Sequence, residues 1–214
     1  ENSSTTHGGG VNGVYGTITQ CVVTKNIATT HGGGLYNCQG AVVNCLIVSN
    51  TAGSYGGGLY DCDGAITHCT IVSNKAVTTG GIAHAAGDVV NCIIWNNTAS
   101  YYSQYYNVPN IRYCCVQNYS GGTGNISTDP LFILDGAYRP KSNSPCVDSG
   151  STEPAVGIDL DNIVRPLGVG PDRGCYEYNA DAPTVAVTPA DIHLYTSTAR
   201  SEEHTSELQS RQVI

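Results

Sequence analysis

Charge is scarce in this sequence of 214 residues: Asp, Glu, Lys and Arg make up 12 % of it, and the formal net charge is −8. A surface that binds nucleic acid or attaches broadly to anionic lipid needs an excess of basic side chains, so both partners are disfavoured. Long hydrophobic runs are also missing, because the longest, such as residues 45–48, fall far short of the ~20 residues that a membrane helix needs. The sequence therefore predicts no nucleic-acid partner and no membrane span.

A helical period of 3.6 residues is missing as well, which disfavours helical and leucine-rich repeats. What is present instead is a period of 24 residues, marked by HGGG at 7–10 and 31–34, YGGG at 55–58 and TGGI at 79–82. A fixed period of this length is typical of a solenoid, in which each unit buries its apolar face by stacking on the next unit.

The pattern inside each unit is typical of β-strands. One column of the aligned repeats holds only cysteine, with a β-branched residue three positions before it and another two positions after it. The column consists of Cys21, Cys45, Cys69, Cys92 and Cys114. Because apolar residues alternate with a position of variable polarity, the pattern predicts strands rather than helices. We therefore predict an all-β fold: a right-handed parallel β-helix of about five coils over residues 1–127, with a C-terminal cap over 128–179.

The cysteine column is interpreted as inward-facing packing. Residues stacked directly in parallel strands hold their Cβ atoms about one strand spacing, ~4.8 Å, apart, whereas a disulfide needs ~3.8 Å, so we expect free thiols. A second column, five residues after the cysteines, holds asparagine, whose amide can hydrogen-bond to the coils above and below. This predicted asparagine ladder consists of Asn26, Asn50, Asn74 and Asn97.

Other interpretations of the repeats are weaker. His7 and His31 should stack one coil apart and could bind a metal, but Tyr55 occupies the next position and no carboxylate recurs beside them. The triple glycines lack the lysine of a phosphate-binding loop. Asp61 and Asp63 are too few to fill the 6 to 8 oxygen positions of calcium. We expect no cofactor in the repeats, and a solvated turn at the two aspartates.

From residue 128 the chain resembles a known family. The motifs that carry the resemblance are DPLF at 129–132, SPCVDSG at 144–150, DLDNIVRP at 159–166 and DRGCYEY at 172–178. Over residues 128–178 the chain looks like the C-terminal portion of bacterial choice-of-anchor Q proteins, which have parallel β-helix domains of the pectin-lyase-like fold. The resemblance implies an extracellular or cell-surface bacterial protein, with no activity common to the family. Asn162 and Arg173 depart from the family pattern, which weakens any claim of a preserved ion site.

We expect the cap to close the last coil, because an open coil would expose unpaired strand edges. Cys146 and Cys175 lie in two cap motifs that should meet, and the exported context that the resemblance implies predicts a disulfide between them. The cap is rich in acids around two arginines, which favours ion pairs over a calcium site. The residues concerned are Asp148, Asp159, Asp161, Asp172, Glu177, Arg165 and Arg173.

The composition changes again in residues 180–214. Residues 180–199 are rich in Pro, Thr and Ala, which suits a linker or the start of another domain. RSEEHTSELQS at 200–210 resembles the conceptual translation of a short-read sequencing adapter, so 200–214 is expected to be an artefact. We also expect the natural ends and the anchor to lie outside this sequence.

Two functions remain open. Tyr101, Tyr102, Tyr105 and Tyr106 cluster where the period breaks, and exposed tyrosines can stack on sugar rings, which favours non-catalytic binding of a polysaccharide or cell-surface glycan. The alternative is a polysaccharide lyase or glycoside hydrolase of the pectin-lyase-like fold whose catalytic coils are missing from this sequence or unrecognised in it. The acids of the coils are scattered, however, and no column pairs two carboxylates at the ~5 to 9.5 Å that a glycosidase uses. We therefore predict no catalytic residues in the coils.

Overall fold

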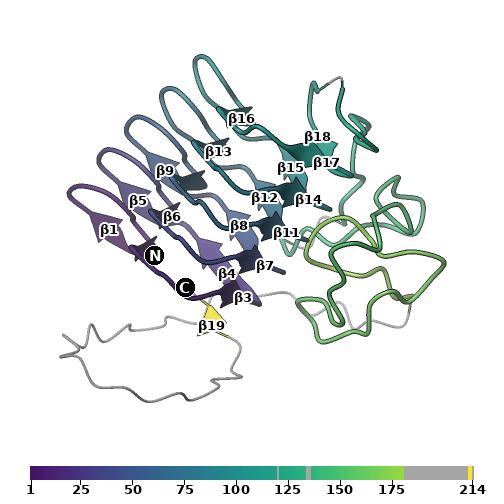
Figure 1. Cartoon of the computed structure of the whole chain (residues 1–214). Helices are drawn as coiled ribbons and strands as arrows, with labels where there is room; N and C mark the ends of the chain where they lie inside the picture. Colours follow the sequence, from purple (N-terminus) through teal and green to yellow (C-terminus); the bar gives the residue numbers. More distant parts are fainter. Residues whose placement is uncertain (120, 134–135, 181–211, 214) are drawn as a thin grey trace.

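The computed structural model describes residues 1–119, 121–133, 136–180 and 212–213. Its regular secondary structure in these residues is entirely β: 19 short strands form four sheets. Every strand pairing is parallel, and paired positions are 22 to 24 residues apart within the coils. The strands stack as a solenoid of about five coils, so the predicted all-β class and the parallel solenoid are confirmed (Figure 1).

Each coil contributes one short strand to sheets B, C and D, and the first three coils also contribute one to sheet A. Sheet A contains β1 (Ser3–Ser4), β5 (Ile27–Ala28) and β9 (Thr51–Ala52). Sheet B contains β2 (Val11–Asn12), β6 (Leu35–Tyr36), β10 (Leu59–Tyr60), β13 (Ile82–Ala83) and β16 (Tyr105–Tyr106). Sheet C contains β3 (Ile18–Thr19), β7 (Val42–Val43), β11 (Ile66–Thr67), β14 (Val89–Val90) and β17 (Ile111–Arg112). Sheet D contains β4 (Cys21–Thr24), β8 (Leu46–Val48), β12 (Thr70–Val72), β15 (Ile93–Trp95) and β18 (Cys115–Val116), with β19 (Gln212–Val213) beside β4.

The core lies inside the coils. In the middle coil, Leu59 of sheet B, Ile66 of sheet C and Ile71 of sheet D are fully buried, and the neighbouring coils place similar residues directly above and below them. Burying one such side chain stabilises the fold by about 1.5–3 kcal/mol. The fixed period therefore becomes a continuous apolar core, because every coil presents the same inward positions.

The glycine triplets allow tight stacking at the turn before sheet B. Gly32 has a φ of +62°, a conformation that other residues rarely adopt. A Cβ atom on Gly33 would lie 2.5 Å from the backbone oxygen of Gly57 in the next coil. The first glycine thus makes the turn, and the second lets two coils approach.

The cysteine column is a row of buried free thiols. The Sγ atoms of its last four members each donate a hydrogen bond to a carbonyl of the preceding coil, as Cys69 does to Val42 at 3.4 Å. The asparagine column is a hydrogen-bonded ladder: Oδ1 of Asn74 accepts from both the backbone N–H and the side-chain amide of Asn50, at 2.9 and 3.0 Å. Both columns therefore satisfy polar groups inside the solenoid.

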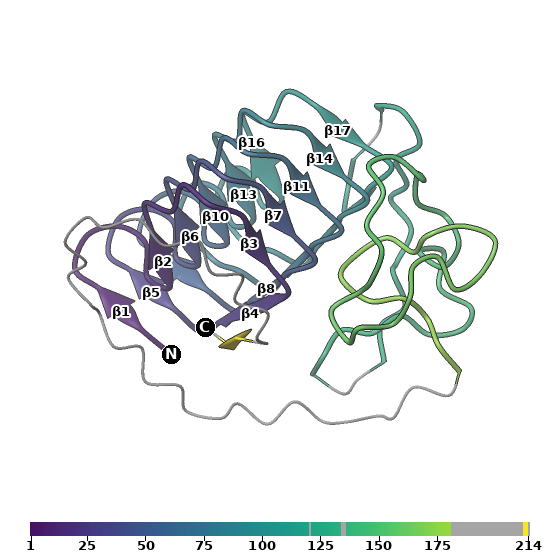
Figure 2. The same ribbon diagram turned by 60° about the horizontal axis from the view of Figure 1, so that its bottom comes forward.

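The cap lies beside the solenoid rather than over its end (Figures 1 and 2). Leu160, Cys175 and Tyr176 of the cap pack on Leu46 and Val72, which point outward from sheet D. We expected this segment to close the last coil. The outer face of sheet D is apolar, however, and needs a cover, so the cap forms a second core there.

The last coil is closed by the final residues of the range 1–127, which we had predicted to form the coils. Ile126 pairs in parallel with Cys115, and its backbone N–H donates to the carbonyl of Cys114 at 2.9 Å. The strand edge of β18 is therefore covered by the segment just before the cap.

The structure contradicts the predicted disulfide, because Cys146 and Cys175 are both free thiols. Cys146 packs on Cys115, whereas the backbone N–H of Cys175 donates to Oγ1 of Thr70. Thr70 and Cys115 are separated by two strand spacings through Ile93, or about 9.6 Å, which exceeds the reach of a disulfide. The two cap motifs do meet, but over different strands of sheet D.

The predictions for the C-terminal part lie largely outside the described residues. These are the linker at 180–199, of which only residue 180 is described, and the translated adapter at 200–214, of which only β19 is described.

Candidate functional site

A continuous row of rings runs along the outer face of sheet B, and we call it the aromatic stripe. Seven of its members come from two columns, the outward positions of the strands and the turn before each strand, and the eighth, His84, directly follows β13. The stripe consists of His7, His31, Tyr36, Tyr55, Tyr60, His84, Tyr102 and Tyr106. Because neighbouring coils repeat both positions, rings far apart in sequence lie next to one another.

The first three coils hold the most regular part of the stripe. The ring of His7 stacks on that of Tyr36 with centroids 4.5 Å apart, and His31 stacks on Tyr60 at 4.6 Å. The planes of these pairs differ by only 9° and 15°. Each histidine from a turn therefore lies against the tyrosine of the next coil. Such aromatic contacts contribute roughly 0.5–1.5 kcal/mol each beyond the area that they bury.

The fourth coil interrupts the two columns with small residues, Thr79 and Ala83, which are fully buried. In this coil the ring of His84 connects the two parts of the stripe, with its centroid 5.9 Å from that of Tyr55 and 5.4 Å from that of Tyr106. The rings of Tyr55 and Tyr106 also approach to 6.2 Å across this coil. The stripe thus remains continuous over all five coils.

Exposure differs along the stripe. Most of its rings are half-buried, and their faces are occupied by neighbouring rings, so mainly their edges are left to solvent. Burial lowers the pKa of His31, with the nearby imidazoles of His7 and His84 adding to the effect, and burial raises the pKa of Tyr60. At the last coil Tyr102 is 47 % exposed and its neighbour Tyr101 is 74 % exposed. Accessible ring faces are therefore concentrated at this end.

The four tyrosines that we singled out do not form one cluster. Tyr102 and Tyr106 belong to the stripe, with centroids 4.5 Å apart, and Tyr101 lies beside them as the most exposed of the four. Tyr105 pairs with Ile82 and packs on the core, where its ring meets Tyr119 edge-on. The assignment of Tyr105 to a binding surface is therefore wrong, because alternate residues of β16 point to opposite faces.

Sequence reasoning missed the rest of the stripe. We expected His7 and His31 to stack one coil apart, and their rings do stack at 5.1 Å, but their contacts with tyrosines of the following coils were not anticipated. Within the described ranges, no group of three or more His, Cys, Asp or Glu side chains could hold a metal ion. The available signal was the tyrosine two residues after the second HGGG and after YGGG, at Tyr36 and Tyr60.

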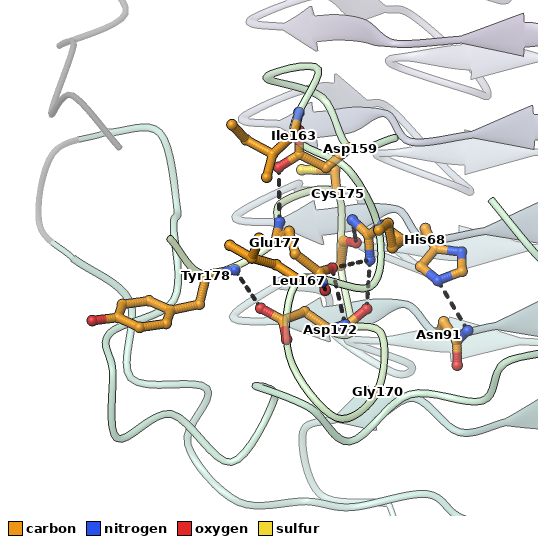
Figure 3. A network of polar contacts seen from close by, with 12 residues as sticks. His68, Asn91, Asp159, Ile163, Leu167, Gly170, Asp172, Cys175, Glu177 and Tyr178 are labelled. Atoms are coloured by element: carbon orange, nitrogen blue, oxygen red, sulfur yellow. Dashed lines mark hydrogen bonds and ion pairs between the residues drawn. The ribbon is translucent and has the colours of Figure 1, made fainter. Parts of the chain in front are cut away.

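The acids of the cap hold its loops together (Figure 3). Asp159 accepts backbone N–H groups from Asp161, Ile163 and Glu177, at 2.7 to 2.8 Å. Asp172 accepts those of Asp148 and Tyr178. Their carboxylates are thus engaged by backbone donors, which favours a structural role over calcium binding.

Burial determines the protonation of this network. It raises the pKa of Asp159 and of Glu177, and that of Asp172 to about 7. Glu177 forms a buried ion pair with Arg165 at 3.2 Å, which opposes the effect of burial on Glu177. The cap therefore contains buried carboxyl groups whose ionisation is unfavourable.

Two hollows lie between the solenoid and cap residues 154–156. One is a groove of about 430 Å³ over the outer face of sheet C, lined by Thr19, Val43 and Thr67 among others. The other is a cavity of about 100 Å³ next to His68 and Arg165. Both share Pro154, Ala155 and Val156 as a wall, so the cavity and the groove are neighbours.

Comparison with protein-family models, with curated proteins and with solved structures gave no match for this chain. Among the residues that the structure describes, no helix is long and apolar enough to cross a membrane.

Proposed function

We propose that this chain is an extracellular bacterial surface protein whose β-solenoid binds polysaccharide without cleaving it. The observation that carries the proposal is the aromatic stripe, a row of eight rings along one outer face that ends in two exposed tyrosines. Large exposed aromatic surface is costly in water and typical of a binding site.

The two parts of the stripe suit different contacts with a sugar chain. The exposed faces at Tyr101 and Tyr102 offer flat apolar surfaces on which the C–H face of a sugar ring can stack. Along the first coils the ring edges offer imidazole nitrogens and phenol hydroxyls, which exchange hydrogen bonds with sugar hydroxyls. A polymer that runs parallel to the solenoid axis meets both in turn.

The cellular setting rests on the resemblance of residues 128–178 to choice-of-anchor Q proteins. Together with the parallel solenoid, this resemblance supports a right-handed β-helix of the pectin-lyase-like type on the bacterial surface. An elongated solenoid is well suited to that place, because its stacked coils present one repeated surface along their length.

The test uses the full chain and a panel of immobilised plant, algal and bacterial polysaccharides. We expect wild-type protein to be retained on at least one of them, and Tyr101→Ala with Tyr102→Ala to bind about tenfold more weakly, a change of ~1.4 kcal/mol. Tyr15→Ala is the matched control, because Tyr15 is 83 % exposed and lies outside the stripe. An equal loss in the control would remove the stripe from consideration.

The same samples should be assayed for new reducing ends and unsaturated ends. We expect neither to accumulate above the level of a sample without protein. Cleavage would overturn the non-catalytic function and support the alternative, a lyase or hydrolase of this fold.

A further inference from the structure

One carboxylate lies in the middle of the aromatic stripe. Asp61 directly follows Tyr60 at the end of β10, in a turn with a φ of +58°. Burial raises the pKa of the Tyr60 phenol, and the negative charge of Asp61 adds to this effect, so the two side chains are close enough to interact. Because Asp61 is only partly buried, a ligand that lies along the stripe can reach its carboxylate.

Asp61 differs from its counterparts in the other coils. One turn residue follows each of the strands β6, β10, β13 and β16 of sheet B, and all four have a positive φ: Asn37, Asp61, His84 and Asn107. Oδ1 of Asn37 accepts from the amide of Gln39 at 2.7 Å, and Nδ2 of Asn107 lies at hydrogen-bond distance, 3.0 Å, from Nδ1 of His84. In the part of the chain that the structure describes, no group donates to the carboxylate of Asp61 and no cation pairs with it. Its charge is therefore left for a ligand.

The outer face of sheet B carries no lysine or arginine in the described coils. The outward positions of its strands are Asn12, Tyr36, Tyr60, Ala83 and Tyr106. Arg112 lies on sheet C and pairs with Asp88 at 3.2 Å. Lys75 is exposed on sheet A, and Lys25 lies in the turn between β4 and β5, two coils from Asp61. Asp61 therefore gives the stripe a negative potential that none of these bases neutralises.

The charge of Asp61 discriminates between classes of polysaccharide. A uronic acid would bring a second carboxylate next to it, on a chain whose formal net charge is −8, so the two would repel. A protonated amino group would be attracted both to the carboxylate and to the face of an aromatic ring within about 6 Å. Accessible ring faces lie farther along the stripe, at the exposed Tyr101 and Tyr102. A chain of amino sugars can therefore place ammonium groups at both places.

We propose that the stripe prefers polysaccharides that carry free amino groups. Asp61 accepts from one ammonium group, and the ring faces of Tyr101 and Tyr102 attract others along the same polymer. An N-acetylated sugar carries no charge on its nitrogen, and a uronic acid carries the opposite charge, so both bind more weakly. This preference names the polymer class for the polysaccharide-binding function proposed above, and it rests on that function.

The experiment measures the binding of soluble oligosaccharides to the full chain by isothermal titration calorimetry at low ionic strength. The probes are oligomers of glucosamine, N-acetylglucosamine and galacturonic acid of equal length, at a pH that keeps the glucosamine amine protonated. We expect the glucosamine oligomer to bind most tightly and the galacturonic acid oligomer most weakly. Asp61→Asn should weaken glucosamine binding about threefold, as an exposed ion pair allows, and leave N-acetylglucosamine binding unchanged. The loss should shrink at ~0.15 M salt, because salt screens exposed charges.

The choice of variants separates the role of Asp61 from misfolding and from overall charge. Asparagine already occupies the same turn position in two other coils, at Asn37 and Asn107, so Asp61→Asn should fold as wild type does. Asp88→Asn changes the net charge by the same amount on sheet C, and should bind the glucosamine oligomer as wild type does.

Several results would overturn the preference. They are an equal loss in Asp88→Asn, equal affinity for all three oligomers, or tighter binding of the galacturonic acid oligomer. Equal binding of an oligolysine of the same charge would also overturn it, because the stripe would then attract any cation. Retention on another polysaccharide without a preference for the amine would reject the inference and keep the polysaccharide-binding function. Retention on none, with no binding of any oligomer, would reject both.

Discussion

The amide of Asn125 takes the place of a sixth cysteine below Cys114. Its Oδ1 accepts the backbone N–H of Cys114 at 2.8 Å, as Sγ of Cys114 accepts that of Cys92 at 3.3 Å. Its Nδ2 donates to the carbonyl of Ile111 at 2.8 Å, as Sγ of Cys114 donates to that of Val89 at 3.4 Å. An asparagine thus ends the thiol column where no further coil is stacked.

Asn125→Ala should destabilise the last coil. It leaves the N–H of Cys114 and the carbonyl of Ile111 without their side-chain partner, which should lower the free energy of unfolding by about 1–3 kcal/mol. Asn125→Cys should lose less, because a thiol fills the equivalent position in five coils and in four of them donates to the preceding coil. Urea unfolding followed by circular dichroism measures both. The exposed Asn143→Ala is the control, and equal midpoints for all three variants would contradict this role.

The asparagine ladder predicts a larger effect at its centre. Asn74 accepts two hydrogen bonds from Asn50, and its Nδ2 donates to the carbonyl of Ile47 and to Oδ1 of Asn97. Asn74→Ala removes all four inside the protein, so the free energy of unfolding should fall by at least ~3 kcal/mol.

The same urea series, with Asn143→Ala as reference, measures that loss. A loss in Asn74→Ala below ~1 kcal/mol would mean that the neighbouring coils re-form these bonds with other groups. In that case the ladder would define the register of the coils without stabilising them.

The period made the interior of the solenoid predictable. Residues 24 apart occupy equivalent places in successive coils, so the inward direction of Cys69 and the ladder position of Asn74 follow from spacing alone. The turn geometry need not be known for this prediction, because parallel stacking gives equivalent positions in successive coils the same side-chain direction.

The outer surface was less predictable, because its contacts join different positions of different coils. His31 stacks on Tyr60, which belongs to the next coil and a different column. The outward residues of sheet D, such as Leu46 and Ile93, vary in polarity along their column, and their cover comes from far along the chain. Cys175, for example, hydrogen-bonds to Thr70 over a separation of 105 residues. The first contact could be read only by comparing two columns, and the second leaves no periodic signal.

The buried imidazole of His68 predicts a specific pH dependence. Its pKa is lowered from 6.5 to about 3 by burial and by the charge of Arg165. Between these values the unfolded chain binds a proton that the folded chain does not, so stability is complete above pH 6.5 and is lost as the pH falls. Each unit of pH corresponds to about 1.4 kcal/mol, which gives on the order of 3 kcal/mol between pH 6.5 and 4.

The comparison with His68→Asn isolates this contribution. Asparagine occupies the equivalent turn position in the coils on either side, at Asn44 and Asn91. Wild type should be the more stable protein at pH 8, and its advantage should shrink by about 3 kcal/mol at pH 4. Asp172, whose pKa is raised to about 7, acts in the opposite direction but is present in both proteins. A constant difference in thermal midpoint from pH 8 to 4 would show that His68 accepts a proton in the folded state.

Cys115 and Cys146 are the pair that we expect to respond to oxidation. Both are fully buried and pack in one small cluster between β18 and the cap. The neighbouring thiol is the largest influence on each, lowering the pKa of Cys146 and raising that of Cys115. With glutathione disulfide as oxidant, the Cys146 thiolate attacks one of its sulfurs, forms a mixed disulfide and releases one glutathione. Cys115 then attacks the sulfur of Cys146 and releases the second glutathione, which leaves one protein disulfide.

Peptide mapping of the full chain by mass spectrometry, before and after oxidation, tests this pairing. We expect a Cys115–Cys146 link that forms slowly, because both thiols are covered, and that is lost in Cys146→Ser. The stacked column should remain alkylatable after unfolding, since its members are held one strand spacing apart. A link between Cys146 and Cys175 instead would require one of the two cap motifs to move relative to the other by about two strand spacings along sheet D. That result would also restore the pairing that the cap motifs alone suggested, and would make the arrangement of the cap over sheet D dependent on its redox state.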